Sequence, residues 1–173
     1  LTYPDIKYGC LKSICEEALL KKAHQLSKAD YLSIVRLTKH VSHDTRPFDS
    51  WISNYKSNNE IVAFDDLYFS PIDFSSSASF IVRLLRKKLP GIFHYSNELD
   101  YNYFEFASLF NEFLTSQAFP PLRLVRSNSI EKGVKLLYKG KTTKLNLVRT
   151  CQLLDIQPLS LSYVFNYLLP YFT

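Results

Sequence analysis

The chain has 173 residues, of which 46% are hydrophobic and 15% aromatic, and it carries a formal net charge of +5. This composition excludes a disordered chain, and the length suits one domain or two small lobes that share a core. No apolar run approaches the ~18 residues that a membrane-spanning helix needs, so the sequence also predicts no transmembrane segment. The positive charge is mild and falls below the strong bias of a dedicated nucleic-acid-binding protein.

Three cysteines, Cys10, Cys15 and Cys151, form no paired framework. An odd number of cysteines is typical of a reducing compartment, so we expect an intracellular protein of the cytoplasm or nucleus. The chain starts at Leu1 and contains no methionine, which favours a domain taken from a longer protein or a processed product.

The first fifth of the chain predicts a helix over residues 4–19, because Pro4 suits a first helical position and apolar residues recur at helical spacing. The expected buried stripe consists of Ile6, Cys10, Leu11, Ile14, Cys15, Ala18 and Leu19. Lys12 and Glu16 fall mostly on the other face. Residues 27–30 resemble a capping box and predict a second helix through residue 41, which would pack on the first as a hairpin.

Further along, the pattern predicts alternating short elements up to residue 119. A helix over 48–55, short strands over 60–64 and 67–69, and a helix over 78–89 are expected in that order. Asn102 is placed to cap a further helix that runs through Leu114. The sequence Phe119-Pro120-Pro121 then ends this helix and marks the best candidate boundary.

Residues 120–173 predict a strand at 122–126, a basic hairpin around Gly140, and two helices separated by a break at 155–158. The layout is similar to a winged helix in shape only, and no motif identifies a family. We therefore predict a mainly α fold with a small β component (α+β). A helical lobe would cover residues 1–119 and a winged-helix-like unit residues 120–173, unless both share one compact domain.

Basic residues gather in two places and predict contact with an acidic partner or a nucleic-acid backbone. The candidates are Lys132, Lys135, Lys139, Lys141, Lys144 and Arg149 around the hairpin, and Arg83, Arg86, Lys87 and Lys88 at a helix end. The alternative is a solvated face whose lysines keep a strand edge from aggregating. The last helix contains no cation, which argues against sequence-specific reading of DNA bases.

The aromatic excess has two interpretations. Tyr and Phe side chains that a helix cannot bury together are typical of protein interfaces, and they equally suit an aromatic-rich core. The candidate interface residues are Tyr95, Tyr101, Tyr103, Phe104, Tyr171 and Phe172.

Chemical motifs are sparse. His40, His43 and Asp44 could form part of a metal site, but no further ligand stands out by spacing, so we predict no metal. The cluster Asp65, Asp66 and Asp73 could hold a divalent cation for phosphoester hydrolysis, although turn and capping roles suit adjacent aspartates better. The sequence has four glycines and no dinucleotide-binding fingerprint, and no cofactor is predicted.

The preferred interpretation is a non-catalytic interaction or assembly domain of a larger intracellular complex, not an enzyme. Its partners would be other protein subunits, and the basic hairpin would contact an acidic protein or a nucleic-acid backbone. The first alternative is a non-specific nucleic-acid-binding winged-helix module, and the second is a metal-dependent phosphoester hydrolase.

Overall fold

The computed structural model describes residues 7–134, 140 and 142–173. Its helices are α1 (Lys7–Gln25), α2 (Phe48–Lys56), α3 (Phe74–Lys87), α4 (Tyr103–Ser116), α5 (Val148–Leu154) and α6 (Leu161–Leu168), with short 3-10 turns at Ala29–Tyr31 and Leu169–Tyr171. Its strands are β1 (Ser33–Leu37), β2 (Lys39–His40), β3 (Ile61–Phe64), β4 (Tyr68–Phe69), β5 (Pro71–Ile72), β6 (Gly91–Tyr95), β7 (Tyr101–Asn102) and β8 (Leu124–Ser127). Helices and strands thus alternate along most of the chain.

The strands form four pairs, and three of these pairs are parallel. β1 pairs with β6, β2 with β5 and β3 with β8 in parallel, whereas β4 and β7 are antiparallel. Parallel neighbours require crossover connections, and here the chain passes through helices between them. The fold is therefore α/β in character, because α2 leads into β3, α3 into β6 and α4 into β8.

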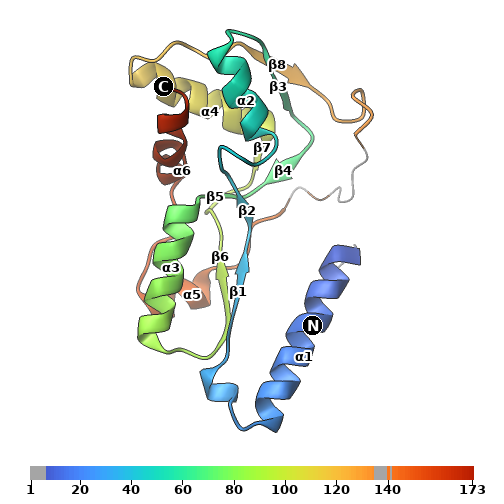
Figure 1. The fold of residues 1–173 in the computed structure, drawn as a ribbon, viewed down its shortest axis with the longest axis vertical. Helices are drawn as coiled ribbons and strands as arrows, with labels where there is room; N and C mark the ends of the chain where they lie inside the picture. Colours follow the sequence, from blue (N-terminus) through green and yellow to red (C-terminus); the bar gives the residue numbers. More distant parts are fainter. Residues whose placement is uncertain (1–6, 135–139, 141) are drawn as a thin grey trace.

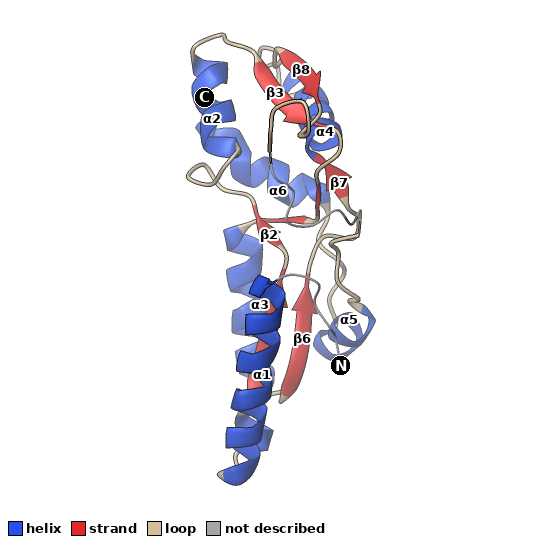
Figure 2. Cartoon of the chain, turned by 90° about the vertical axis from the view of Figure 1, so that its right-hand side faces the viewer, coloured by secondary structure: helices blue, strands red, loops and turns tan. Residues whose placement is uncertain are grey.

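The elements fall into two groups (Figure 1). One group surrounds the β1–β6 pair, with α3 and α1 at its two sides and α5 packed against β6. The other group joins α2, α4 and α6 to the β3–β8 pair. The side view in Figure 2 shows an elongated molecule, and β2 and β5 lie where the two groups meet (Figure 1).

Aromatic side chains fill the core between α4 and the C-terminal helix. The Phe106 ring meets Phe165 edge-on at 5.4 Å between centroids, and Phe110 meets Phe172 at 4.9 Å. Phe106 and Phe110 are fully buried. The aromatic excess of the sequence therefore builds a core that ties the last helix to the middle of the chain.

Two helices begin at side-chain caps. Asn102 accepts a hydrogen bond from the Glu105 amide, and Glu105 in turn accepts one from the Asn102 amide, which completes a capping box at the start of α4. This confirms the predicted cap at Asn102. Asp73 caps α3 by accepting from the Ser76 amide at 2.7 Å, so this helix starts a few residues before the predicted position.

The predicted second helix is wrong. Residues 33–37 and 39–40 form β1 and β2, because β-branched residues such as Ile34 and Val35 suit a strand that can pair with β6. The predicted helical hairpin therefore does not form.

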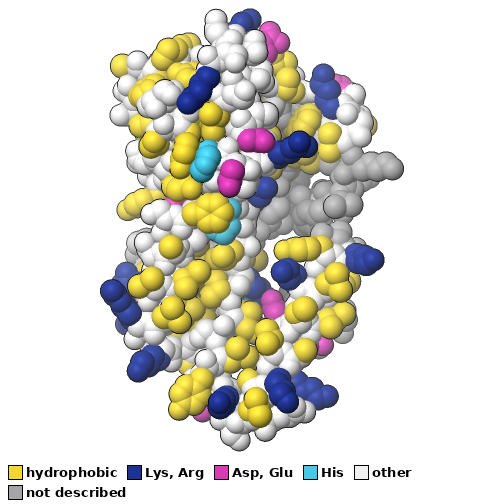
Figure 3. Space-filling view, in the orientation of Figure 1, with side chains coloured by type: hydrophobic (Ala, Val, Ile, Leu, Met, Phe, Trp, Pro, Cys, Tyr) yellow, Lys and Arg dark blue, Asp and Glu magenta, His cyan; other side chains and the backbone are white. Residues whose placement is uncertain are grey.

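The predicted apolar stripe of α1 is also wrong in its direction. None of the nineteen residues of α1, all of them described, is buried. Leu11, Ile14 and Leu19 are 53%, 61% and 53% exposed, and Cys10 and Cys15 lie on the exposed side with them. The half-buried positions are instead Gly9, Ser13, Glu16, Leu20 and Ala23. Hydrophobic side chains along α1 are visible in Figure 3.

The α+β fold with a winged-helix-like unit at 120–173 is likewise wrong. β8 pairs with β3 of the preceding part, α5 packs on β6, and α6 lies against β5. The predicted hairpin falls mainly on residues 135–139 and 141, which lie outside the described residues. Ser160 caps the last helix, so Pro158 precedes it instead of opening it.

The buried phenol of Tyr103 leads us to expect that the protein loses stability at alkaline pH. Burial raises the pKa of Tyr103 to about 12 from an ordinary value of 10.0. Because the folded state favours the neutral phenol, Tyr103 contributes to the free energy of unfolding. This contribution is fully present below pH 10 and is lost as the pH rises toward 12, and its size is on the order of 2–3 kcal/mol. Urea unfolding at pH 9 and pH 11.5 should show this loss together with that of Tyr95, whose pKa burial also raises to about 12, and Tyr103→Phe should make the loss smaller. An equal loss in the Phe variant would contradict the assignment.

Candidate functional site

A cavity of about 540 Å³ lies between α1 and β1. Its polar lining comes from Tyr8, Lys12, Ser13 and Glu16 of α1 and from Arg36 of β1. Leu145, in the segment that leads to α5, closes part of it. The space-filling view shows the hollow between α1 and the strands (Figure 3). The cavity thus gathers proton-donating and charged groups next to a parallel strand pair.

Tyr8 and Lys12 lie one helical turn apart and therefore share a face of α1. The Lys12 ammonium is 5.3 Å from the centroid of the Tyr8 ring, and Tyr8 is 67% exposed. A phenol can give or take a proton, and the Lys12 ammonium lies over the ring that carries this phenol. The pair is equipped for general acid–base chemistry on a ligand in the cavity.

Glu16 and Arg36 join α1 to β1 by a two-pronged ion pair. Arg36 Nε lies 2.9 Å from Glu16 Oε1, and a second guanidinium nitrogen lies 2.5 Å from Oε2. Hydrogen bonding to Arg36 holds the pKa of Glu16 below its ordinary value, and the same bond raises the pKa of Arg36. Both groups therefore stay charged, and the helix is tied to the strand at this point.

The sequence analysis missed this site. It placed Lys12 and Glu16 on an outer face and gave Tyr8 no role. The signal is the recurrence of Tyr8, Lys12 and Glu16 at intervals of four, which puts a phenol, an ammonium and a carboxylate on one helical face. That signal is short, and only the structure shows that this face borders a cavity.

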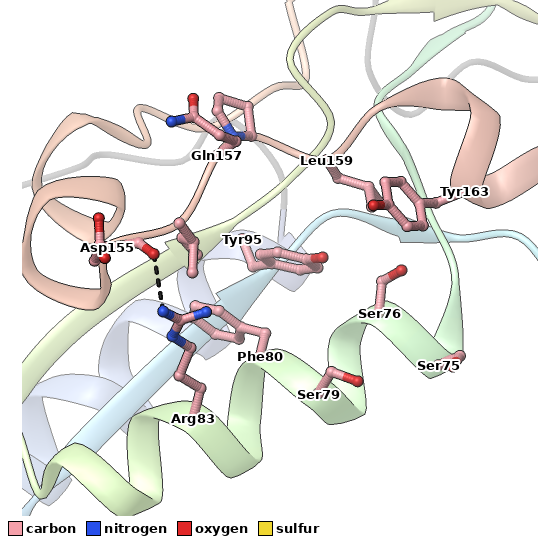
Figure 4. A pocket seen from close by; sticks show the side chains of 12 residues that line it. Ser75, Ser76, Ser79, Phe80, Arg83, Tyr95, Asp155, Gln157, Leu159 and Tyr163 are labelled. Atoms are coloured by element: carbon pink, nitrogen blue, oxygen red, sulfur yellow. Dashed lines mark hydrogen bonds between the residues drawn. The ribbon is translucent and has the colours of Figure 1, made fainter.

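A second cavity, of about 520 Å³, lies between α3 and residues 155–163 (Figure 4). Arg83 donates to the Asp155 carbonyl at 2.9 Å, so its charge already serves this packing. Burial raises the pKa of Tyr95 to about 12, and its ring stacks on Phe80 at 4.6 Å. The buried ring of Tyr95, stacked on Phe80, is suited to a packing role.

The predicted basic residues are spread over several elements of the fold. Arg149 donates to the Ile92 carbonyl at 2.7 Å, and Lys144 donates to the Glu98 carbonyl at 3.3 Å. Lys132 lies in a turn, whereas Arg86 and Lys87 end α3 and Lys88 caps it. Lys135, Lys139 and Lys141 lie outside the described residues. Contact of these cations with an acidic partner stays a prediction.

The predicted interface aromatics lie in or against the core. Tyr95 and Phe172 are buried, so their rings are not available to a partner. The other four, Tyr101, Tyr103, Phe104 and Tyr171, are partly buried and pack against the core. The aromatic-core interpretation explains their placement, and an interface role for these four stays a prediction.

The residues of the predicted acidic and histidine clusters each make their own local contacts. Asp65 pairs with Arg126 at 2.7 Å, and Asp66 accepts a hydrogen bond from the Ser129 amide at 3.0 Å, while Asp73 caps α3. The rings of His40 and His43 stack on Phe74 and Tyr171, respectively. Across the part of the chain that the structure describes, no group of three His, Cys, Asp or Glu side chains could hold a metal ion.

The α/β fold of the chain is also found in solved structures of known enzymes. No protein-family model and no curated protein sequence matches the chain. Solved structures do match it, and they include reductases, dehydratases and epimerases of sugar nucleotides, several of them in complex with NAD or NADP.

Three of these structures illustrate the match. The dTDP-4-dehydrorhamnose reductase from Yersinia enterocolitica covers 100% of this chain and 59% of its own, with a TM-score of 0.79 and 18% identity. The dTDP-glucose 4,6-dehydratase from Bacillus anthracis, in complex with NAD, covers 96% of this chain and 53% of its own, with a TM-score of 0.67 and 12% identity. The UDP-glucuronic acid 4-epimerase from Bacillus cereus, in complex with NAD, covers 100% of this chain and 55% of its own, with a TM-score of 0.66 and 14% identity. The chain therefore spans about half the length of the solved structures that it matches.

These matches overturn several predictions. A fold shared with sugar-nucleotide enzymes contradicts the non-catalytic assembly domain, the nucleic-acid-binding winged-helix module and the metal-dependent phosphoester hydrolase. The expectation that the chain is not an enzyme is wrong for the same reason, and the nuclear setting loses its basis. Separately, none of the helices within the described ranges is long and apolar enough to cross a membrane.

Proposed function

We propose that the chain is part of an enzyme that modifies the sugar of a nucleotide sugar, with Tyr8 as the acid–base group. The observation that carries the proposal is the Tyr8–Lys12 pair in a cavity beside β1, in a fold whose solved examples include dTDP- and UDP-sugar enzymes. Tyr8 would give its phenolic proton to the oxygen of a sugar carbonyl, or take a proton from a sugar hydroxyl. Lys12 would stabilise the phenolate in either direction.

A nicotinamide dinucleotide is implied by the solved structures that contain NAD or NADP. The residues of this chain do not fit its pyrophosphate, which needs a glycine-rich turn between a strand and a helix. The four glycines, Gly9, Gly91, Gly133 and Gly140, are far apart and form no such turn. We therefore assign to this chain only the acid–base and sugar-binding part of the reaction.

The dinucleotide would then bind to a separate unit. The exposed side of α1 and the unpaired edge of β1 suit the docking of that unit. In the described ranges β1 pairs with β6 alone, so its other edge is open to a further strand. Leu11, Ile14 and Leu19 offer apolar surface on the outer face of the neighbouring helix. An intracellular setting is part of this proposal, and it fits a chain whose odd number of cysteines favours a reducing compartment.

Titration of the protein with UDP-glucose and dTDP-glucose, with free glucose as control, tests the proposal. We expect at least one nucleotide sugar to bind with a Kd below about 1 mM, the range usual for enzyme substrates. Binding should shift the NMR resonances of the Tyr8 ring, since Tyr8 lines the cavity. Failure of every nucleotide sugar to bind, or binding that leaves Tyr8 unchanged, would reject the proposed site.

A further inference from the structure

Little apolar burial holds α1 in place, since Leu20 and Ala23 on its inner face are only half-buried. All nineteen of its residues are described and none is buried, and its inner face carries small or polar side chains such as Gly9, Ser13 and Glu16. Helices in proteins are usually held by an apolar face, so another interaction must hold this one. Because Tyr8 and Lys12 belong to α1, whatever holds the helix also sets the geometry of the site.

A chain of polar contacts links α1 to three other segments. Glu16 of α1 binds Arg36 of β1 through both carboxylate oxygens. Arg36 lies directly opposite His94 in the β1–β6 register, with its NH1 nitrogen 3.4 Å from His94 Nε2. His94 Nδ1 lies 3.0 Å from the Asn146 carbonyl, in the segment that leads to α5.

These contacts fix the direction of the Arg36 guanidinium. A carbonyl oxygen can only accept, so His94 Nδ1 carries the proton and Nε2 is left to accept from Arg36. With NH1 held by His94, Nε and NH2 are presented together to Glu16, which is the fork geometry that binds a carboxylate most firmly. A lysine could keep the charge but not this fork.

We propose that Arg36 is a positioning residue that fixes α1, and therefore Tyr8 and Lys12, beside β1. Glu16 and His94 orient its guanidinium and do not themselves need to touch the ligand. The inference rests on the proposed acid–base role of Tyr8. Its test includes readouts that do not require turnover, so the two proposals can fail separately.

The test compares Arg36→Lys, Glu16→Gln and His94→Leu with the wild-type protein. Loss of a pair of this kind should raise amide hydrogen exchange across α1 by about fivefold to tenfold, with β1, β6 and α4 unchanged. The resonance of ¹³Cζ-labelled Tyr8 should shift in the same variants. Where turnover is measurable, kcat should fall about tenfold and KM should change less than twofold.

Two further variants sharpen the result. His94→Gln keeps both an acceptor and a donor and should restore wild-type exchange in α1. Arg83→Lys is the matched control, because Arg83 ties α3 to the Asp155 carbonyl away from α1 and should leave α1 unchanged. Exchange in α1 within twofold of wild type would overturn the proposal. Increased exchange spread equally over the core, or increased exchange without a change at Tyr8, would reduce Arg36 to a structural role and also overturn it.

Discussion

Under the proposed function, replacing Tyr8 by phenylalanine is expected to lower turnover of a nucleotide sugar by about 10²- to 10⁴-fold, the usual contribution of a positioned acid–base group. The ring and its packing remain, and only the proton-transferring oxygen is lost. Binding of the nucleotide sugar should therefore change less than twofold. Steady-state kinetics and calorimetric titration of the same preparations measure the two effects separately.

The control for this variant is Tyr31→Phe. Tyr31 is 86% exposed in the turn that follows α1 and does not line the cavity, so its phenol should be dispensable. Lys12→Met should also reduce turnover, whereas Lys21→Met on the same helix should not. Turnover of Tyr8→Phe within threefold of wild type would remove Tyr8 from the mechanism.

Leu114→Ala is expected to destabilise the protein by about 2–5 kcal/mol, because the side chain is fully buried in α4 and its removal leaves a cavity. The matched control is Leu85→Ala in α3, where the side chain is 67% exposed and the change should stay within about 0.5 kcal/mol. Both substitutions gain the same helix propensity, so their difference reports burial alone. Urea unfolding gives both values.

Equal losses at the two positions would contradict the aromatic core between α4 and α6. A smaller slope of the unfolding curve in Leu114→Ala would point instead to a change in the unfolded or native compactness. The comparison thus tests the fold without any assumption about function.

Elements with local signals could be predicted from the sequence. The Asn102 cap, the helix at 48–56 and the strand at 61–64 each depend on neighbouring residues, and the structure confirms them. The fold class could not be predicted, since β1 joins β6 and β3 joins β8 across more than fifty residues. Parallel pairing of this kind leaves no short-range mark in the sequence.

The candidate site could not be predicted because the sequence gives the wrong orientation for α1. The sequence assigns the apolar side of α1 to the core, as amphipathic spacing normally does, but the structure turns that side outward. The polar side then borders the cavity. Sequence alone could not reveal this, because periodicity shows that two faces differ and not which neighbour each face meets.

The outward row of Leu11, Ile14 and Leu19 makes the position of Tyr8 sensitive to whatever shields that row from water. Shielding one such side chain completely is worth about 1.5–3 kcal/mol. A surface that covers the outer face would thus add to the Glu16–Arg36 ion pair in setting the position of Tyr8. The outer face of α1 would then control assembly, and its inner face would control the reactivity of Tyr8.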